Sequence, residues 1–148
     1  MSENVPSVLQ SAPCMHRHPD NPVLAAADVP YEAGLVFNAG VARYQGKYVM
    51  VFRNDFDRGP DSPHPRQTNM GLAFSDDGVC WDVEPEPCWS WQDEEVRRVY
   101  DPRITVIDGR CHLCFAIDTA HGVCGGIAVT DDFAHFEVLS TSTPDNRN

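Results

Sequence analysis

The sequence predicts an all-β fold built from a repeated antiparallel unit, and two observations predict it. From Asn38 onward, short apolar runs alternate with turn residues, a pattern typical of all-β domains. In addition, residues 38–55, "NAGVARYQGKYVMVFRND", align with residues 101–118, "DPRITVIDGRCHLCFAID", at a constant offset of 63 that places Gly46 on Gly109. Four short strands repeated at this spacing indicate a β-propeller, of which about two blades are present. A two-sheet sandwich built from the two copies is the alternative.

The first element is an irregular segment. Residues 1–24 are rich in proline and show no strand pattern. We therefore expect an N-terminal irregular segment over residues 1–24, followed by a partial propeller over residues 25–148.

Each repeated copy then opens with a β-hairpin. The tight turns fall at Gln45-Gly46 and Asp108-Gly109, and Asp-Gly is among the strongest hairpin signals. Both copies continue alike, because residues 70–83 match residues 125–138 at an offset of 55. The offset falls by eight because the first copy alone has a long polar loop, residues 56–69, after its hairpin.

Two short segments between these strands have their own predictions. The segment "SDDGVCW" (75–81) resembles the Asp-box turn of sialidase-like propellers, which serves the fold rather than the chemistry. The segment "DEEVRR" (93–98) is the one place where the sequence suggests a turn or two of helix.

The charge of the chain excludes several classes of partner. The chain has 22 acidic and 11 basic side chains and a net charge of −11, which disfavours binding to nucleic acid or to anionic lipid. It has neither an apolar run long enough to span a membrane nor a secretory signal, so we expect a cytoplasmic protein. The net charge does not exclude binding of a small anion, because the electrostatic field within one pocket can be opposite in sign to the net charge of the chain.

The six cysteines lack the compact spacing of a disulfide framework, so we expect reduced, mostly buried thiols. Cys111 and Cys114 have the spacing of a zinc knuckle. They fall in a strand pattern, however, which sends residues three apart to opposite faces. No second Cys/His pair has usable spacing, so the sequence predicts no metal site and no cofactor.

The candidate site follows from the repeat. In a propeller the innermost strands line the central channel, and here these strands are expected to begin at Asn38 and Asp101. A polar residue at the same place in each copy indicates a shared pocket. Pro102 is expected to hold Asp101 in extended backbone and so to aim its carboxylate. The alternative is that Asp101 is an ordinary turn-capping aspartate.

Three polar residues follow the apolar run "YVMVF". Arg53, Asn54 and Asp55 supply a cation, an amide and a carboxylate, which suit the hydroxyl groups of a sugar. A solvated strand end with a salt bridge explains the same residues. Near the C-terminus, the motif "PDNRN" contains Arg147, whose planar guanidinium suits a phosphate or a carboxylate.

Several motifs in order carry a family resemblance. They are "FNAGVARYQGKYVMVFRNDF", "GLAFSDDGVCW", "YDPRITVIDGRCHLCFAIDT", "GGIAVTDDF" and "PDNRN". Over about residues 20–148 the chain resembles glycoside hydrolase family 130, the five-bladed β-propeller mannoside phosphorylases. Within that family it is most similar to the enzymes that act on 4-O-β-D-mannosyl-D-glucose.

The resemblance implies inverting phosphorolysis, in which inorganic phosphate is the co-substrate and one carboxylic acid suffices. It implies that Asp101 is this general acid and that its proton reaches the leaving oxygen through the mannosyl 3-hydroxyl. Asn38 and Arg53 would hold the mannosyl ring, Tyr100 would shape the pocket, and Arg147 would bind phosphate. The other phosphate ligands of the family lie in blades that this chain does not contain.

Three features stay open at this point. His64 and Arg66, in the long loop, face the acceptor sugar in one interpretation and belong to a surface loop in another. A β-mannoside hydrolase and a sugar-binding propeller fragment without turnover are the alternatives to a phosphorylase. The acceptor sugar and the oligomeric state, including a homo-oligomer, are not determined by the sequence.

Overall fold

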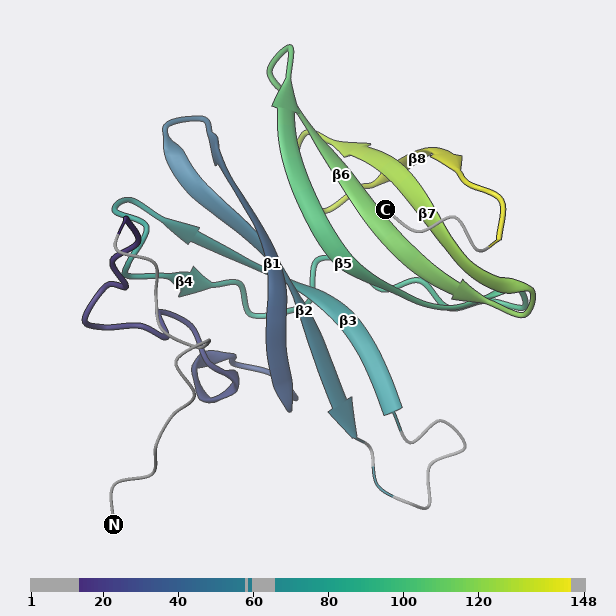
Figure 1. Cartoon of the computed structure of the whole chain (residues 1–148), viewed down its shortest axis with the longest axis horizontal. Coiled ribbons are helices and arrows are strands. Elements are labelled where there is room, and N and C mark those ends of the chain that lie inside the picture. The colour runs from purple at the N-terminus through teal and green to yellow at the C-terminus, as the bar shows by residue number, and fades with distance from the viewer. Residues whose placement is uncertain (1–13, 58, 60–65, 145–148) are drawn as a thin grey trace.

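The computed structural model describes residues 14–57, 59 and 66–144, which form two four-stranded sheets (Figure 1). The first sheet contains β1 (Leu35–Tyr44), β2 (Lys47–Asp57), β3 (Arg66–Ser75) and β4 (Asp82–Val83). The second contains β5 (Val96–Ile107), β6 (Arg110–Thr119), β7 (Gly122–Thr130) and β8 (Glu137–Thr141). Strands pair antiparallel in chain order within each sheet. The predicted all-β class and the four-stranded repeat are confirmed.

Both predicted hairpin turns are present. The φ angles are 50° and 86° at Gln45 and Gly46, and 50° and 79° at Asp108 and Gly109. Left-handed backbone at both central residues matches the right-handed twist of the flanking strands. These turns therefore fix the register of β1 on β2 and of β5 on β6.

Each inner hairpin also carries a β-bulge at the same repeat position. The register shifts between Phe37 and Gly40 in β1, and between Tyr100 and Arg103 in β5. In each case the inner strand has one residue more than its partner, so the backbone must turn locally. Asn38 and Asp101 take up this turn, with left-handed φ angles of 51° and 55°.

The bulges correct two predictions. β1 begins at Leu35 and β5 at Val96, so Asn38 and Asp101 lie within strands and not at their starts. The extended backbone expected of Asp101 is also wrong, because the extra residue of the bulge outweighs the local preference imposed by Pro102.

The helical turn expected at residues 93–98 is absent as well. The carboxylate of Asp93 accepts hydrogen bonds from the backbone N–H groups of Glu95 and Val96, and this turn leads directly into β5. Pairing of Val96 and Arg98 with β6 outweighs the weak local propensity for helix.

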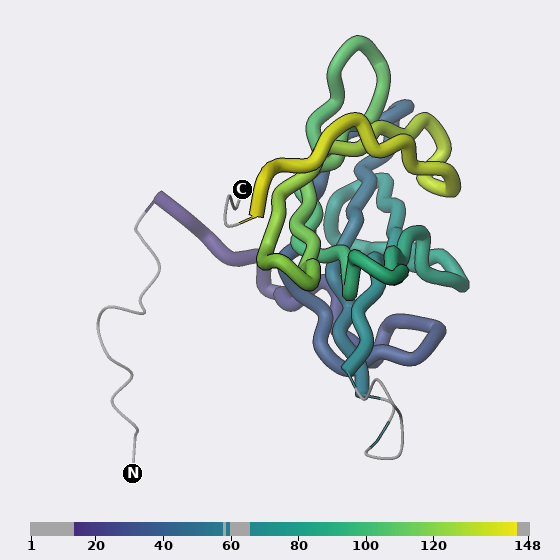
Figure 2. The backbone as a smooth tube through the Cα atoms, turned by 90° about the vertical axis from the view of Figure 1, so that its right-hand side faces the viewer, coloured from purple at the N-terminus to yellow at the C-terminus, as the bar shows by residue number. Residues whose placement is uncertain are grey.

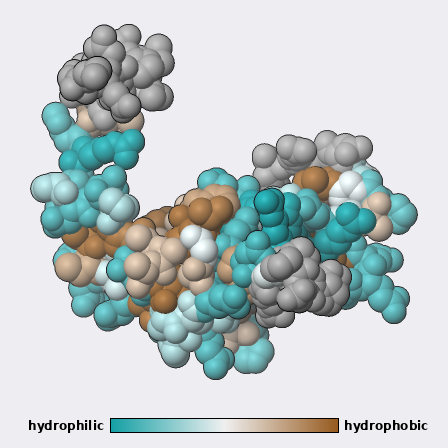
Figure 3. All heavy atoms as spheres, turned by 90° about the horizontal axis from the view of Figure 1, so that it is seen from below, coloured by the Kyte–Doolittle hydropathy of each residue, from teal (hydrophilic) through white to brown (hydrophobic). Residues whose placement is uncertain are grey.

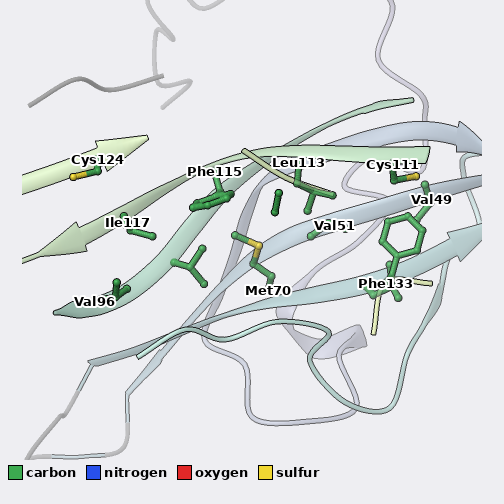
Figure 4. Close-up of a cluster of buried hydrophobic side chains, with 13 residues drawn as sticks. Val49, Val51, Met70, Val96, Cys111, Leu113, Phe115, Ile117, Cys124 and Phe133 are labelled. Carbon is green, nitrogen blue, oxygen red and sulfur yellow. The ribbon is translucent and has the colours of Figure 1, made fainter. Parts of the chain in front are cut away.

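The main core lies between the two sheets (Figure 4). Val49, Val51 and Met70 of the first sheet face Leu113 and Phe115 of the second, and all five are fully buried. Trp89, in the connection between the sheets, packs edge-on against Phe115 with the ring centroids 5.0 Å apart. This packing holds the two sheets as one unit.

A smaller cluster covers the other face of the first sheet. Phe52, Met50 and Ala73 pack there against Val29, which follows the short 3-10 turn η2 (Ala26–Asp28). β2 is therefore buried on both faces, which explains its nearly continuous apolar run. Seen from below in Figure 3, hydrophobic side chains form a patch left of centre that is bordered by hydrophilic ones.

The described part of the N-terminal segment, residues 14–24, contains no helix or strand and leads away from the sheets in Figure 2. Residues 1–13 lie outside the described residues, and the domain boundary at residue 24 stays a prediction. Within the described residues, no helix has the length and hydrophobicity needed to cross a membrane.

Candidate active site

The two bulges bring Asn38 and Asp101 into contact, although 63 residues separate them. The Asn38 amide nitrogen donates a hydrogen bond to Oδ1 of Asp101 at 2.9 Å. Gly40 makes this approach of β1 to β5 possible. A Cβ at Gly40 would lie 2.8 Å from the Ile104 nitrogen and 2.9 Å from the Arg103 Cα.

Arg53 completes this contact from the neighbouring strand β2. Its Nη1 donates to Oδ1 of Asp101 at 3.1 Å, so one carboxylate oxygen accepts from both Asn38 and Arg53. The guanidinium lies between two aromatic rings, 4.7 Å from the ring centroid of Phe37 and 4.7 Å from that of Tyr100. Its side chain is only 12% exposed, so it is enclosed by these partners.

Asp55 fixes the orientation of Arg53. Its two carboxylate oxygens accept from Nε at 2.8 Å and from Nη2 at 2.6 Å, a bidentate pair of high geometric specificity. Thr68 donates a third hydrogen bond to Asp55 at 2.8 Å. Burial raises the pKa of Asp55, but the hydrogen bonds from Arg53 and Thr68 outweigh it and hold that pKa below its ordinary value.

A second carboxylate and arginine pair holds Tyr100. Asp118 accepts from the Tyr100 hydroxyl at 2.6 Å and from Nε of Arg98 at 2.6 Å. The Arg98 guanidinium also lies 4.9 Å from the Tyr100 ring centroid. Burial, together with the hydrogen bond to Asp118, raises the pKa of Tyr100 to about 12, so its hydroxyl stays protonated at neutral pH.

A cavity of about 510 Å³ opens beside these residues. Its walls include Arg98, Tyr100, Asp101, Arg103 and Asp118, all from β5 and β6. This volume is in the range of pockets that take a small organic ligand. The Asp101 side chain is 33% exposed and so is accessible to such a ligand.

The predicted site residues are only partly assembled. Asn38, Arg53, Asp55, Tyr100 and Asp101 form one connected cluster.

Asn54 does not join this cluster. It is fully buried on the opposite face of β2, where its amide nitrogen donates to the Glu32 carbonyl and to Asn69. Asn54 points away from the cluster because side chains alternate along a strand, and its contact with a sugar stays a prediction. Arg147 and His64 lie outside the described residues, and Arg66 is the first residue of β3.

Sequence reasoning missed Phe37, Thr68, Arg98, Arg103 and Asp118. A signal was present for Asp118, because the repeat aligns it with Asp55, and both carboxylates orient an arginine. No local signal marked Arg98, which lies in the segment expected to be helical.

The Asp-box-like turns lie apart from the cluster and serve the fold. Oδ1 of Asp77 accepts from the backbone N–H groups of Val79 and Cys80, and Asp132 accepts in the same way in the second sheet. These bonds satisfy turn donors that would otherwise be left unpaired.

The six cysteines are all free, as predicted, but only Cys111 and Cys124 are buried, while Cys14 and Cys80 are exposed. The expectation of mostly buried thiols is therefore wrong. Among the described residues, no group of three or more His, Cys, Asp or Glu side chains is placed to hold a metal ion.

The comparisons with known proteins identify the family of the chain. A sequence model of the glycoside hydrolase 130 family, described as beta-1,4-mannooligosaccharide phosphorylase, matches residues 15–146. The chain is 29% identical to a beta-1,4-mannooligosaccharide phosphorylase of Ruminococcus albus, over 98% of this chain and 45% of the relative. It is 31% identical to a 1,2-beta-oligomannan phosphorylase of Thermoanaerobacter, over 68% of this chain and 35% of the relative. The chain thus spans less than half the length of these relatives.

Solved structures support the fold. The structure of a beta-1,2-mannobiose phosphorylase of Listeria innocua superposes with a TM-score of 0.70 at 20% identity, over 82% of this chain and 49% of that one. The fold is accordingly propeller-like, which favours the propeller over the sandwich.

Proposed function

Because the chain belongs to glycoside hydrolase family 130, we propose that the protein carrying it cleaves β-1,4-mannosides by inverting phosphorolysis. Inorganic phosphate attacks the anomeric carbon of the terminal mannosyl unit, and the bond from that carbon to the leaving oxygen breaks. The products are α-mannose 1-phosphate and a free sugar, which is glucose if the substrate is mannosyl-glucose. The whole propeller in this proposal has five blades, of which the two sheets are two.

Asp101 is the general acid of this proposal, and one observation carries the assignment. Asn38 and Arg53 both donate to Oδ1, while Oδ2 has no hydrogen-bond partner among the described residues. The two hydrogen bonds occupy the lone pairs of Oδ1. The proton that the acid transfers is therefore carried by Oδ2. This proton passes to the mannosyl 3-hydroxyl, whose own proton passes to the leaving oxygen.

The residues around Asp101 have supporting roles. Asn38 and Arg53 hold the carboxyl group and border the mannosyl ring, and Tyr100 forms a wall of the pocket. Because phosphate supplies the nucleophile, no second catalytic carboxylate is needed, unlike in ordinary glycosidases. Arg147 is proposed as a phosphate ligand on the family resemblance alone.

The test is a turnover assay with and without phosphate. The protein is incubated with mannosyl-β-1,4-glucose, β-1,4-mannobiose or β-1,2-mannobiose, and mannose 1-phosphate is measured. We expect phosphate-dependent release from the β-1,4-linked substrates, and a loss of at least about 10²-fold in rate for Asp101→Asn. The matched control is Asp76→Asn, because Asp76 is 83% exposed and, within the described part of the chain, its ion-pair partner is the exposed Lys47.

Three outcomes contradict parts of the proposal. Release of free mannose without phosphate would indicate a β-mannoside hydrolase, and the absence of any turnover would indicate a sugar-binding protein. Full activity of the Asp101→Asn variant would remove Asp101 from the role of acid.

A further inference from the structure

A second pocket adjoins the candidate active site and has no role in the proposed reaction. It has a volume of about 300 Å³ and lies where the start of β3, the connection before β5 and the start of β5 meet. Its walls include Arg66, Thr68, Asn69, Trp91, Arg97 and Arg98. We refer to it as the arginine pocket.

The charge of the arginine pocket opposes that of the chain. Three guanidinium groups line it, those of Arg66, Arg97 and Arg98, and no carboxylate is among its lining residues. Among the described residues, neither Arg66 nor Arg97 has an ion-pair partner. In a chain of net charge −11, two arginines that have no ion-pair partner in the described ranges create a local positive field at this small cavity.

The carboxylate that follows the lining residue Gln92 is occupied. Asp93 accepts hydrogen bonds from the backbone of Glu95 and Val96 and from the indole nitrogen of Trp91. These three bonds lower the pKa of Asp93, so it stays ionised and bound to its own loop.

The uncharged part of the wall is rigid and supplies a further donor. Trp91 stacks on Trp89 with ring centroids 6.3 Å apart, and its nitrogen is held by Asp93 at 2.8 Å. Asn69 is buried, and its Oδ1 accepts from Asn54, so its amide nitrogen is the group left to donate to a ligand. An ordered aromatic ring beside converging donors suits a small polar ligand with one apolar face.

We propose that the arginine pocket binds a sugar that carries an oxyanion, either a phosphate or a carboxylate. Arginine recognises both groups through its planar set of donors. The small volume and the net charge of the chain exclude a polyanion such as nucleic acid.

Two residues connect this pocket with the candidate active site. Arg98 lines both cavities, and Thr68 lines the arginine pocket while donating to Asp55, which holds Arg53. A sugar in the arginine pocket therefore lies next to the cavity that contains Asp101. That the ligand is a sugar rests on the proposed function, whereas the recognition of an oxyanion rests on the arginines.

Isothermal titration calorimetry tests the proposal without any turnover. Glucose, glucose 6-phosphate, glucuronate and inorganic phosphate are titrated into the wild type and into Arg66→Gln, Arg97→Gln and the double variant. We expect glucose 6-phosphate or glucuronate to bind at least about tenfold more tightly than glucose, and each substitution to weaken this binding about tenfold. The stronger of the two ligands identifies the source of the oxyanion.

The matched control is Arg17→Gln, which removes one exposed arginine that lines none of the described cavities. It should bind like the wild type. Equal affinity for glucose and both charged sugars, unchanged binding in the double variant, or binding of inorganic phosphate as tight as that of the charged sugars would each overturn the proposal. Because none of these measurements needs turnover, a failure of phosphorolysis would not be mistaken for a failure of this pocket.

Discussion

Replacing Gly40 by alanine tests whether the approach of β1 to β5 controls the candidate site. A Cβ at this position would meet backbone atoms only, at 2.8 Å from the Ile104 nitrogen, 2.9 Å from the Arg103 Cα and 3.0 Å from the Pro102 oxygen. Backbone atoms of a paired strand cannot rotate away, so the two strands must separate.

The size of the effect follows from these distances. Ordinary carbon contacts begin near 3.4 Å, so β1 and β5 must separate locally by about 0.6 Å. The same shift would stretch the 2.9 Å hydrogen bond from Asn38 to Asp101 to the limit of a hydrogen bond. Overpacking of this kind costs about 1–3 kcal/mol of unfolding free energy. Since misplacement by 1 Å costs about 10² in rate, we expect a loss of roughly tenfold in kcat.

The assay combines urea denaturation with the phosphorolysis rate. Gly46→Ala is the comparison, because Gly46 has a φ of +86° and a Cβ there would have no neighbouring atom within 4 Å. This variant should lose about 1–2 kcal/mol through left-handed backbone alone and keep its kcat. A Gly40→Ala protein with wild-type kcat would refute the argument that this contact sets the geometry of Asp101.

Three further predictions concern stability. The pKa of Asp55 is held below its ordinary value of 3.8, so its contribution to stability is complete above that pH and is lost as the pH falls through the pKa of the folded state. In urea denaturation from pH 6 to pH 2, the unfolding free energy of Asp55→Asn should therefore fall less at acid pH than that of the wild type. Asp77→Ala removes the acceptor for two turn N–H groups, so thermal denaturation should show a lower Tm, with kcat unchanged. Phe115→Ala empties the centre of the main core and should cost about 3–5 kcal/mol by urea denaturation, against under 1 kcal/mol for the exposed Leu139→Ala.

The sequence predicted those parts of the fold that depend on local chemistry. The turns at Gln45-Gly46 and Asp108-Gly109 need only two residues that tolerate left-handed backbone, so their positions were visible in the repeat. The bulges at Asn38 and Asp101 depend on how the inner strand pairs with its neighbour. A polar residue before an apolar run looks like the start of a strand unless that pairing is known.

The parts of the candidate site that depend on local sequence were also predictable. Side chains alternate along β2, which puts Arg53 and Asp55 on one face and Asn54 on the other. The burial of Asn54 could therefore have been predicted from the sequence pattern. Arg98 was not predictable, because its role comes from contacts with Tyr100 and Asp118, which only the tertiary structure brings together.

The enclosure of Arg53 affects the thermodynamics of ligand binding. A free arginine side chain carries about 2 kcal/mol of rotamer entropy, which a flexible site loses when a ligand arrives. Here Phe37, Tyr100, Asp55 and Asp101 already restrict the guanidinium in the folded protein. This side-chain entropy is lost when the protein folds. Binding of a sugar therefore does not have to include the entropy cost of ordering Arg53.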